Sequence, residues 1–203
     1  MEERDELSVQ ELAEEDLLRA DFYGFIAHLL AAPPVDATLA RLCQLQTDDT
    51  PLGQALGALS GTARGVTPAA AADEFKALFI GLTEGELRPY ASYYLTGFLY
   101  EKPLAALRSD LERLGARRAD GVCEPEDHIA SLCETMRGLI VGAFGAPADL
   151  QTQRRFFAAY LQPWTSRFFQ DLRRARQAVL YRPVGAVGGA FMGVEREAFA
   201  MIG

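Results

Sequence analysis

Apolar side chains recur along much of this chain at steps of three and four residues, the spacing of positions on one face of an α-helix. The clearest apolar stripes run through Leu18, Phe22, Phe25 and Leu29, through Leu104, Leu107, Leu111 and Leu114, and through Ile129, Leu132, Met136 and Ile140. No run of alternating β-branched residues is long enough to predict a strand. The pattern therefore predicts an all-α protein, in which about nine or ten helices form a single globular bundle over residues 1–203.

Proline, glycine and capping residues predict where these helices begin and end. Ser8 and Glu11 have the spacing of a capping box, in which each side chain satisfies the backbone N–H of the other residue. Pro125 is expected at the first position of a long helix, where its missing N–H costs nothing. Residues 61–65 and 81–89 contain glycines without a helical stripe, and we expect loops there.

Composition limits the classes of protein that the chain can be. Hydrophobic residues make up 49% and charged residues 24%, as in an ordinary globular domain. The net charge of −8, without a cluster of basic residues, excludes a typical nucleic-acid-binding surface and suits a basic or polar partner. No segment approaches the roughly 18 apolar residues of a membrane span, and residues 1–6 do not begin a secretory signal. Cys43, Cys123 and Cys133 are an odd number of cysteines, so we expect no disulfide framework and a cytoplasmic location.

The segment Glu124–Ile129 carries the most suggestive chemistry. A helix that begins at Pro125 would place Glu126 and Asp127 in its first turn, where carboxylates interact favourably with the helix dipole. These acids are then either caps of a solvated helix start or ligands for a cationic group. His128 beside Asp127 favours the second hypothesis only weakly, since an imidazole next to a carboxylate can also bond the backbone.

Four segments of the chain resemble the TorD/DmsD family of redox-enzyme maturation chaperones. They match the family's motifs in order and spacing, and they are Phe75–Gly81, Pro89–Leu95, Glu124–Ile129 and Leu161–Trp164. The resemblance extends over roughly residues 70–200. Each motif alone is a weak signal, but four in the family's order form a specific one.

This resemblance implies a cytoplasmic chaperone that is not an enzyme and holds no cofactor of its own. Its expected partners are the apo form of a molybdopterin oxidoreductase and the twin-arginine signal peptide of that enzyme. The chaperone would assist cofactor insertion and delay export until the client is folded. The resemblance also implies helix bundles that meet at a hinge at about residues 117–123. A monomer or a homodimer is compatible with the sequence.

The same resemblance identifies the residues that would bind the client. They are Asp127 and His128 of the functional motif, Glu124 and Glu126 as supporting acids, and Pro89, Ser92 and Tyr94 of a second motif in the same groove. A twin-arginine peptide carries two guanidinium groups followed by an apolar stretch. A groove that combines carboxylates with apolar and aromatic groups would complement both parts of such a peptide.

An alternative interpretation is a metal- or nucleotide-binding protein centred on Cys123, Asp127, His128 and Cys133. The spacing lacks the paired cysteines of structural zinc sites, and Cys133 falls in an apolar stripe, where a free cysteine behaves as a small hydrophobic residue. The chain also lacks the glycine-rich loop and lysine that cradle nucleotide phosphates. We therefore expect no metal site, no nucleotide site and no catalytic residues.

Two further patterns are expected to be structural. Trp164 and Phe168 share an aromatic stripe, which is more often part of a core than of a ligand site. Gly185, Gly189 and Gly193 recur at steps of four, which favours a close contact between helices of this chain over a contact between two copies.

Overall fold

The structure, a computed structural model, describes residues 12–81, 85–100, 102–116 and 124–202. Within these ranges the chain forms ten α-helices and two single-turn π-helical segments, η1 and η2. They are α1 Glu14–Ala31, α2 Asp36–Leu42, α3 Pro51–Ala63, α4 Pro68–Phe75, η1 Lys76–Ile80, α5 Ala91–Thr96, α6 Lys102–Arg113, α7 Ile129–Val141, α8 Leu150–Phe156, η2 Phe157–Leu161, α9 Thr165–Arg174 and α10 Tyr181–Met201. The predicted all-α class and helix number are confirmed. No described helix is long and apolar enough to cross a membrane.

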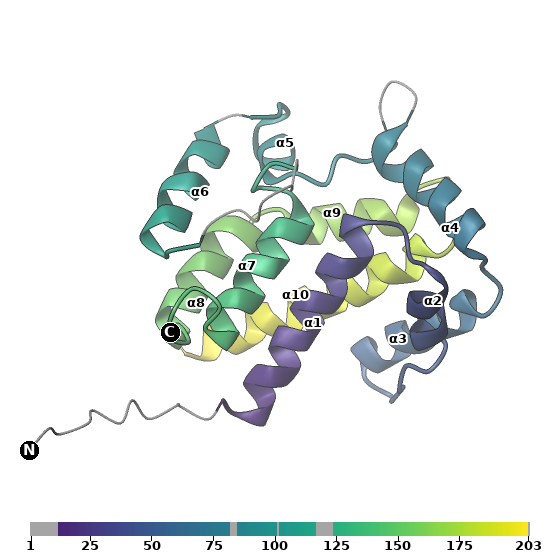
Figure 1. Cartoon of the computed structure of the whole chain (residues 1–203), viewed down its shortest axis with the longest axis horizontal. Coiled ribbons are helices and arrows are strands. Elements are labelled where there is room, and N and C mark those ends of the chain that lie inside the picture. Colours follow the sequence, from purple (N-terminus) through teal and green to yellow (C-terminus); the bar gives the residue numbers. More distant parts are fainter. Residues whose placement is uncertain (1–11, 82–84, 101, 117–123, 203) are drawn as a thin grey trace, which may run out of the picture.

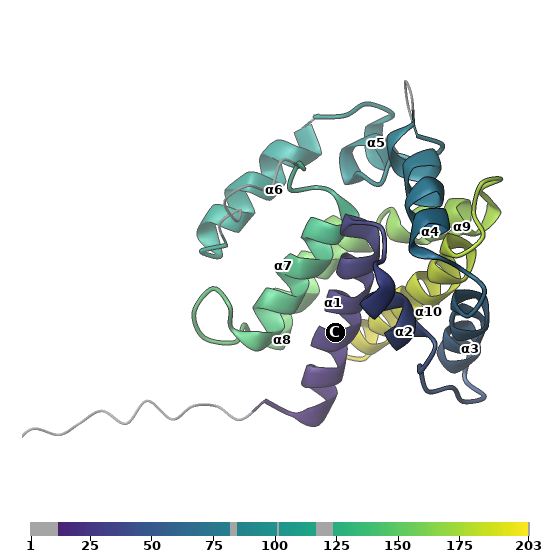
Figure 2. The same cartoon turned by 45° about the vertical axis from the view of Figure 1, so that its right-hand side comes forward.

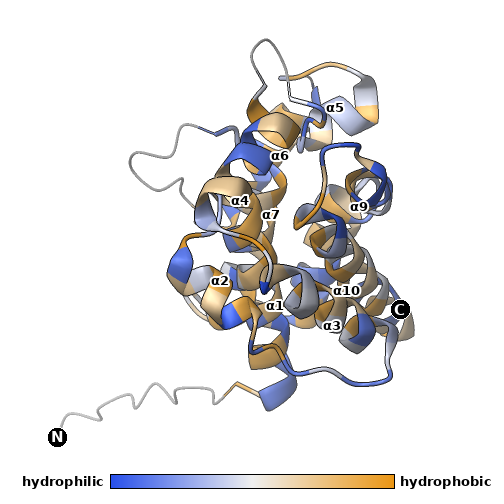
Figure 3. Cartoon of the chain, turned by 90° about the vertical axis from the view of Figure 1, so that its right-hand side faces the viewer, coloured by the Kyte–Doolittle hydropathy of each residue, from blue (hydrophilic) through white to orange (hydrophobic). Residues whose placement is uncertain are grey.

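Helices α1, α7, α9 and α10 form the centre of the molecule (Figure 1). Helix α1 packs along α7, while α10 lies against α9 on one side and α3 on another. Helix α9 turns Phe168, Phe169 and Leu172 inward, and Figure 3 shows its hydrophobic side toward the interior. Helix α6 lies at the edge of the molecule, beside α5 (Figure 2).

The buried face of α1 extends beyond the predicted stripe, of which Leu29 is buried and Phe22 and Phe25 pack against the core. Leu18 is 54% exposed, whereas Tyr23, Ile26 and Leu30 are almost completely buried. The prediction assumed one covered face, but α1 packs against α7 and also contacts α10. Of the two predicted loops, residues 61–65 are partly helical, because α3 continues to Ala63.

Glycines of α10 allow it to approach α9 closely. A Cβ atom added at Gly188 would lie 2.2 Å from the ring of Phe169, and one at Gly185 would lie 3.0 Å from the carbonyl oxygen of Phe169. A Cβ at Gly193 would meet no atom within 4 Å. Of the predicted series, Gly185 makes the close contact, a Cβ at Gly189 would lie at an ordinary 3.7 Å from Phe169, and Gly193 is open; the tightest approach is at Gly188, which the prediction did not include.

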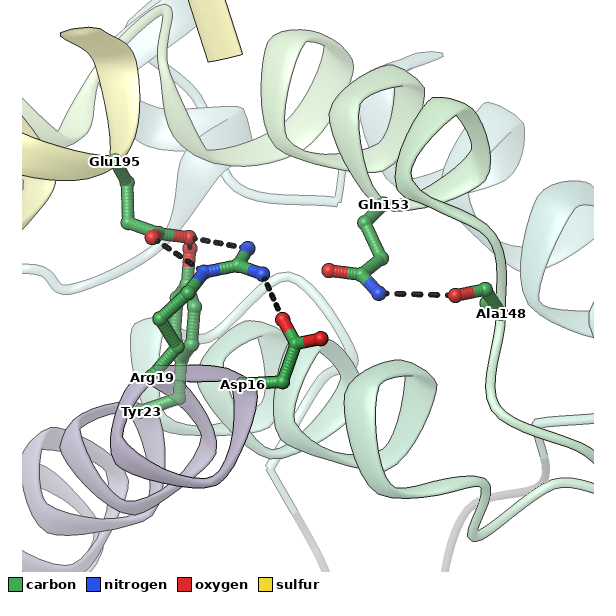
Figure 4. A network of polar contacts seen from close by, with 6 residues as sticks. All are labelled: Asp16, Arg19, Tyr23, Ala148, Gln153 and Glu195. Carbon is green, nitrogen blue, oxygen red and sulfur yellow. Dashed lines mark hydrogen bonds and ion pairs between the residues drawn. The ribbon is translucent and has the colours of Figure 1, made fainter. Parts of the chain in front are cut away.

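A buried polar network connects α1 to α10 (Figure 4). The side chain of Glu195 is 1% exposed and accepts hydrogen bonds from Arg19 at 2.8 and 3.0 Å and from the hydroxyl of Tyr23 at 2.8 Å. Arg19 also pairs with Asp16 at 2.7 Å. Burial, and then the Glu195 carboxylate, hold the pKa of Tyr23 well above its usual value, so its hydroxyl remains a donor.

Two carboxylates from distant parts of the chain hold the connection between α9 and α10. Glu74 of α4 accepts the backbone N–H groups of Val179, Leu180 and Tyr181 at 2.7–3.0 Å. Glu86 accepts those of Arg176 and Gln177 at 2.7 and 3.1 Å. The N–H groups of Leu180 and Tyr181 lie at the start of α10, so Glu74 serves as its N-terminal cap, whereas Glu86 holds the turn that precedes the helix.

The capping box at Ser8 and Glu11 and the hinge at residues 117–123 lie outside the described residues. The division of the chain into one domain with that hinge therefore stays a prediction.

Candidate functional site

The second and third motifs of the sequence meet in space. Tyr90 and His128 form an isolated antiparallel bridge. The N–H of Ile129 donates to the carbonyl oxygen of Pro89 at 2.9 Å, and the N–H of Ala91 donates to that of Asp127 at 3.0 Å. We call this pairing of residues 89–92 with residues 127–129 the clasp.

Asp127 caps α5, a helix from another part of the chain. Its side chain is 1% exposed, and its Oδ2 accepts the backbone N–H of Ser92 at 2.9 Å. Tyr90, which directly precedes α5, provides no side-chain cap. The carboxylate of Asp127 therefore satisfies an N–H group that would otherwise be unpaired at the start of this helix.

His128 is the N-terminal cap of α7. Its Nδ1 accepts the N–H of Ala130 at 3.1 Å, and its ring lies edge-on to that of Tyr90, with the ring centres 5.1 Å apart. Burial lowers the pKa of His128 to about 4, so the imidazole is neutral near pH 7. Since Nδ1 is the acceptor, the proton of the neutral ring resides on Nε2.

The predicted helix start at Pro125 is wrong, because α7 begins at Ile129. His128 has an extended backbone, with φ −64° and ψ 140°, as its bridge to Tyr90 requires. The carbonyl oxygen of Pro125 instead accepts the N–H of His128 in a turn. Asp127 and His128 are thus buried parts of the clasp and not members of an exposed first helical turn.

We expect Asp127→Ala to lower the free energy of unfolding by about 1–3 kcal/mol, because the buried N–H of Ser92 loses its acceptor. Asp127→Asn keeps an acceptor oxygen and should cost less. Urea denaturation of both variants measures the difference.

Ser92→Ala is the matched control for this effect. It keeps the backbone N–H and removes a buried hydroxyl that has no hydrogen-bond partner among the described residues. Its stability should lie within about 0.5 kcal/mol of wild type. An Asp127→Ala protein that unfolds like wild type but no longer binds a client peptide would instead place the carboxylate in direct contact with the client.

Glu124 and Glu126 lie at the surface beside the clasp. Glu124 is exposed and accepts the hydroxyl of Tyr90 at 2.5 Å. Burial, and then this carboxylate, raise the pKa of Tyr90. Glu126 is 18% exposed and accepts two bonds from the guanidinium of Arg108, at 2.9 and 3.0 Å. These two acids are the members of the motif that a partner can reach.

Both acids line an apolar pocket of about 460 Å³, which we call the α6–α7 pocket. Its walls include Leu111 of α6, Ala130 and Gly138 of α7, and Ala143 and Phe144 beyond the end of α7. Glu134 and Arg137 also line it, and they pair with each other at 3.6 Å. The pocket therefore has Glu124 and Glu126 before the start of α7, the Glu134–Arg137 pair along the helix, and Ala143 and Phe144 beyond its end.

The structure brings Pro89 and Ser92 to Asp127 and His128, but it places Tyr94 elsewhere. The hydroxyl of Tyr94 donates to Asp171 at 3.2 Å, and its ring lies against Trp164. Tyr94 lines a second pocket of about 500 Å³, which is polar and includes Arg167 and Asp171. It does not share a groove with the clasp.

No group of three or more His, Cys, Asp and Glu side chains within the described ranges could hold a metal ion. Cys123, which the metal hypothesis requires, lies outside those ranges. Cys133 is completely buried in α7, and burial raises the pKa of its thiol, which is therefore protonated.

Comparison with known proteins gives the family. A crystal structure of a proposed redox enzyme maturation protein from Archaeoglobus fulgidus has the same fold, with a TM-score of 0.59 and 18% identity over 94% of this chain and 99% of that one. No curated protein sequence matches the chain. Residues 45–170 match the model of the nitrate reductase delta subunit family. The chain therefore belongs to the nitrate reductase delta subunit family, and its predicted kinship with the TorD/DmsD maturation chaperones is confirmed.

Proposed function

We propose that this protein binds the twin-arginine signal peptide of an apo-molybdopterin oxidoreductase in the α6–α7 pocket. The observation that supports this function is the placement of Glu124 and Glu126 at one end of an apolar pocket. Two carboxylates near an apolar surface match a peptide that carries two guanidinium groups followed by an apolar stretch.

The arrangement also gives the peptide a direction. In a twin-arginine signal peptide the arginines precede the apolar stretch. The acids lie before α7 and the apolar groups at Ala143 and Phe144 follow it. The bound peptide would therefore run parallel to α7, with its apolar side chains between Leu111 and Phe144.

The buried clasp supports this site without contacting the peptide. Asp127 and His128 fix the backbone directly after Glu126, and Tyr90 holds the side chain of Glu124. A carboxylate whose position is fixed before binding loses less entropy when it pairs with an arginine. The net charge of −8 would further accelerate the approach of a cationic peptide.

In the cell, we infer, the protein acts in the cytoplasm as a chaperone and not as an enzyme. Bound to the signal peptide, it would keep the apoenzyme from the export machinery while the molybdenum cofactor is inserted. Release of the peptide from the pocket would then permit export of the folded client.

We expect the double variant Glu124→Gln/Glu126→Gln to bind a synthetic twin-arginine peptide about tenfold more weakly than wild type. Each carboxylate contributes a charge-assisted bond, which partial exposure reduces, so a loss of about 1.4 kcal/mol in total is expected. The deficit should shrink as salt rises, because partly exposed charges are screened. Calorimetric titration at two salt concentrations measures both effects.

The matched control is Glu112→Gln/Glu197→Gln, which removes the same charge from exposed positions on α6 and α10. This control should bind the peptide nearly as wild type does. An equal loss of peptide affinity in both double variants would show that the effect arises from net charge alone. If Glu124→Gln/Glu126→Gln binds the peptide with wild-type affinity, the peptide does not bind in the α6–α7 pocket.

A further inference from the structure

Arg108 already occupies the carboxylate that a client arginine would use. From α6, its Nε and Nη2 donate to the same oxygen of Glu126, at 3.0 and 2.9 Å. The bond to Glu126 raises the pKa of Arg108. An incoming guanidinium would approach a carboxylate beside which Arg108 already lies, and the two like charges would repel each other, so a client arginine competes with Arg108 for Glu126.

The position of Arg108 relates it to the α6–α7 pocket. Leu111, one helical turn further along α6, lines the pocket, as does Glu126 itself. The pair therefore crosses from α6 to the segment before α7 beside the acidic end of the pocket. Arg108 is 54% exposed, whereas Glu126 is 18% exposed. The arginine can thus move into solvent while the acid stays in place.

We propose that Arg108 is an internal competitor for the acidic end of the α6–α7 pocket, which a client arginine must displace. This inference rests on the proposed function. Displacement exchanges one guanidinium for another at Glu126, so the pair lowers the affinity for every peptide that uses this carboxylate. The apparent affinity is the intrinsic affinity multiplied by the fraction of molecules in which Arg108 has left Glu126.

Competition of this kind affects only ligands that use Glu126. A peptide that binds only through its apolar stretch does not need Glu126 and is unaffected by Arg108. The same factor applies to a weak cationic ligand, which has no apolar contact to add, and to a twin-arginine segment, which keeps the contacts of its adjoining apolar stretch.

The test compares Arg108→Gln with wild type in calorimetric titrations against two synthetic peptides. One peptide has two adjacent arginines before an apolar stretch, and the other has two glutamines in their place. Partly exposed ion pairs are weak, so Arg108→Gln should bind the arginine peptide about two- to fivefold more tightly than wild type. Its affinity for the glutamine peptide should not change.

Arg113→Gln is the matched control. Arg113 lies on the same helix, is 75% exposed and pairs with Asp110, so its loss changes net charge equally and leaves the bond between Arg108 and Glu126 intact. It should bind both peptides like wild type. Arg108→Lys, which keeps the charge but offers a single donor group, should fall between wild type and Arg108→Gln.

The outcomes separate this inference from the proposed function. A wild type that does not bind the arginine peptide overturns the proposed function, and the inference with it. A wild type that binds while Arg108→Gln gains nothing, or gains no more than Arg113→Gln, overturns only the role of Arg108. Thermal melting of each variant shows whether it is folded, and Arg108→Lys provides the comparison if Arg108→Gln is not.

Discussion

Trp164→Ala should lower the free energy of unfolding by about 3–5 kcal/mol, the usual cost of removing a large buried ring. The side chain is 2% exposed, and its ring centre lies 5.4 Å from that of Tyr94 and 5.7 Å from that of Phe168. Its Nε1 donates to the carbonyl oxygen of Tyr160 at 2.7 Å. The substitution would leave both a cavity and an unpaired acceptor. Urea denaturation gives the magnitude.

Trp164→Phe separates these two contributions. It keeps most of the ring volume and loses the bond to Tyr160, so it should cost much less than Trp164→Ala. Any weakening of peptide binding should follow the loss of folded protein, because Trp164 does not line the α6–α7 pocket. A Trp164→Ala protein with wild-type stability and impaired peptide binding would contradict the structural role.

Local pattern predicted the helices well where one face of a helix is covered. Leu104, Leu107 and Leu111 are spaced by three and four residues, and all three are buried in α6. The stripe of α1 covered only part of the buried face, because a second helix packs against another side of α1 and the burial pattern then no longer follows a single stripe. Helical spacing therefore predicts that a helix is present more reliably than it predicts how many other helices pack against it.

Contacts between distant residues explain why the start of α7 and the role of Asp127 could not be predicted. Pro125 is well suited to begin a helix, but pairing with residues 89–91 holds His128 in an extended conformation. Asp127 caps a helix that begins 36 positions earlier in the chain. Glu74 likewise caps α10 across more than 100 residues. A spacing rule applied within one segment cannot predict hydrogen bonds between segments so far apart in the sequence.

The candidate site was predictable in its acids but not in its apolar part. Glu124 and Glu126 were expected as supporting residues, and they are the members of their motif that face the α6–α7 pocket. The pocket wall is formed by small residues such as Ala130, Gly138 and Ala143. Small residues contribute little to a hydrophobic pattern, so no apolar stripe in the sequence predicted this surface. Arg108 was missed because only the fold brings α6 to Glu126.

The division between clasp and pocket predicts that stability and peptide binding depend on different residues of the motif. Substitutions at Asp127 should be measurable mainly in denaturation, and those at Glu124 and Glu126 mainly in titration. Asp127 accepts its bond in the interior, whereas Glu124 is exposed and Glu126 is 18% exposed. The six-residue motif Glu124–Ile129 thus has two parts, since its first three residues reach the surface and its last three face the core.

Glu195→Leu should also destabilise the fold by about 3–5 kcal/mol, because it removes one partner of a buried ion pair. The hydroxyl of Tyr23, which is completely buried, would lose its acceptor. Arg19 would keep only Asp16 among the partners in this network (Figure 4). Glu195→Gln retains an acceptor for Tyr23 and should cost less. Guanidinium chloride denaturation of the two variants measures the difference.

Replacement of the whole network tests whether the cost arises from the pair itself or from the groups left unpaired. In Arg19→Met/Tyr23→Phe/Glu195→Leu no charged or hydroxyl group of the pair remains, so this triple variant should be more stable than Glu195→Leu alone. That recovery would show that desolvation of Arg19 and Tyr23 dominates the loss. A triple variant less stable than Glu195→Leu would show instead that the polar bonds between α1 and α10 contribute a net stabilisation that apolar packing cannot replace.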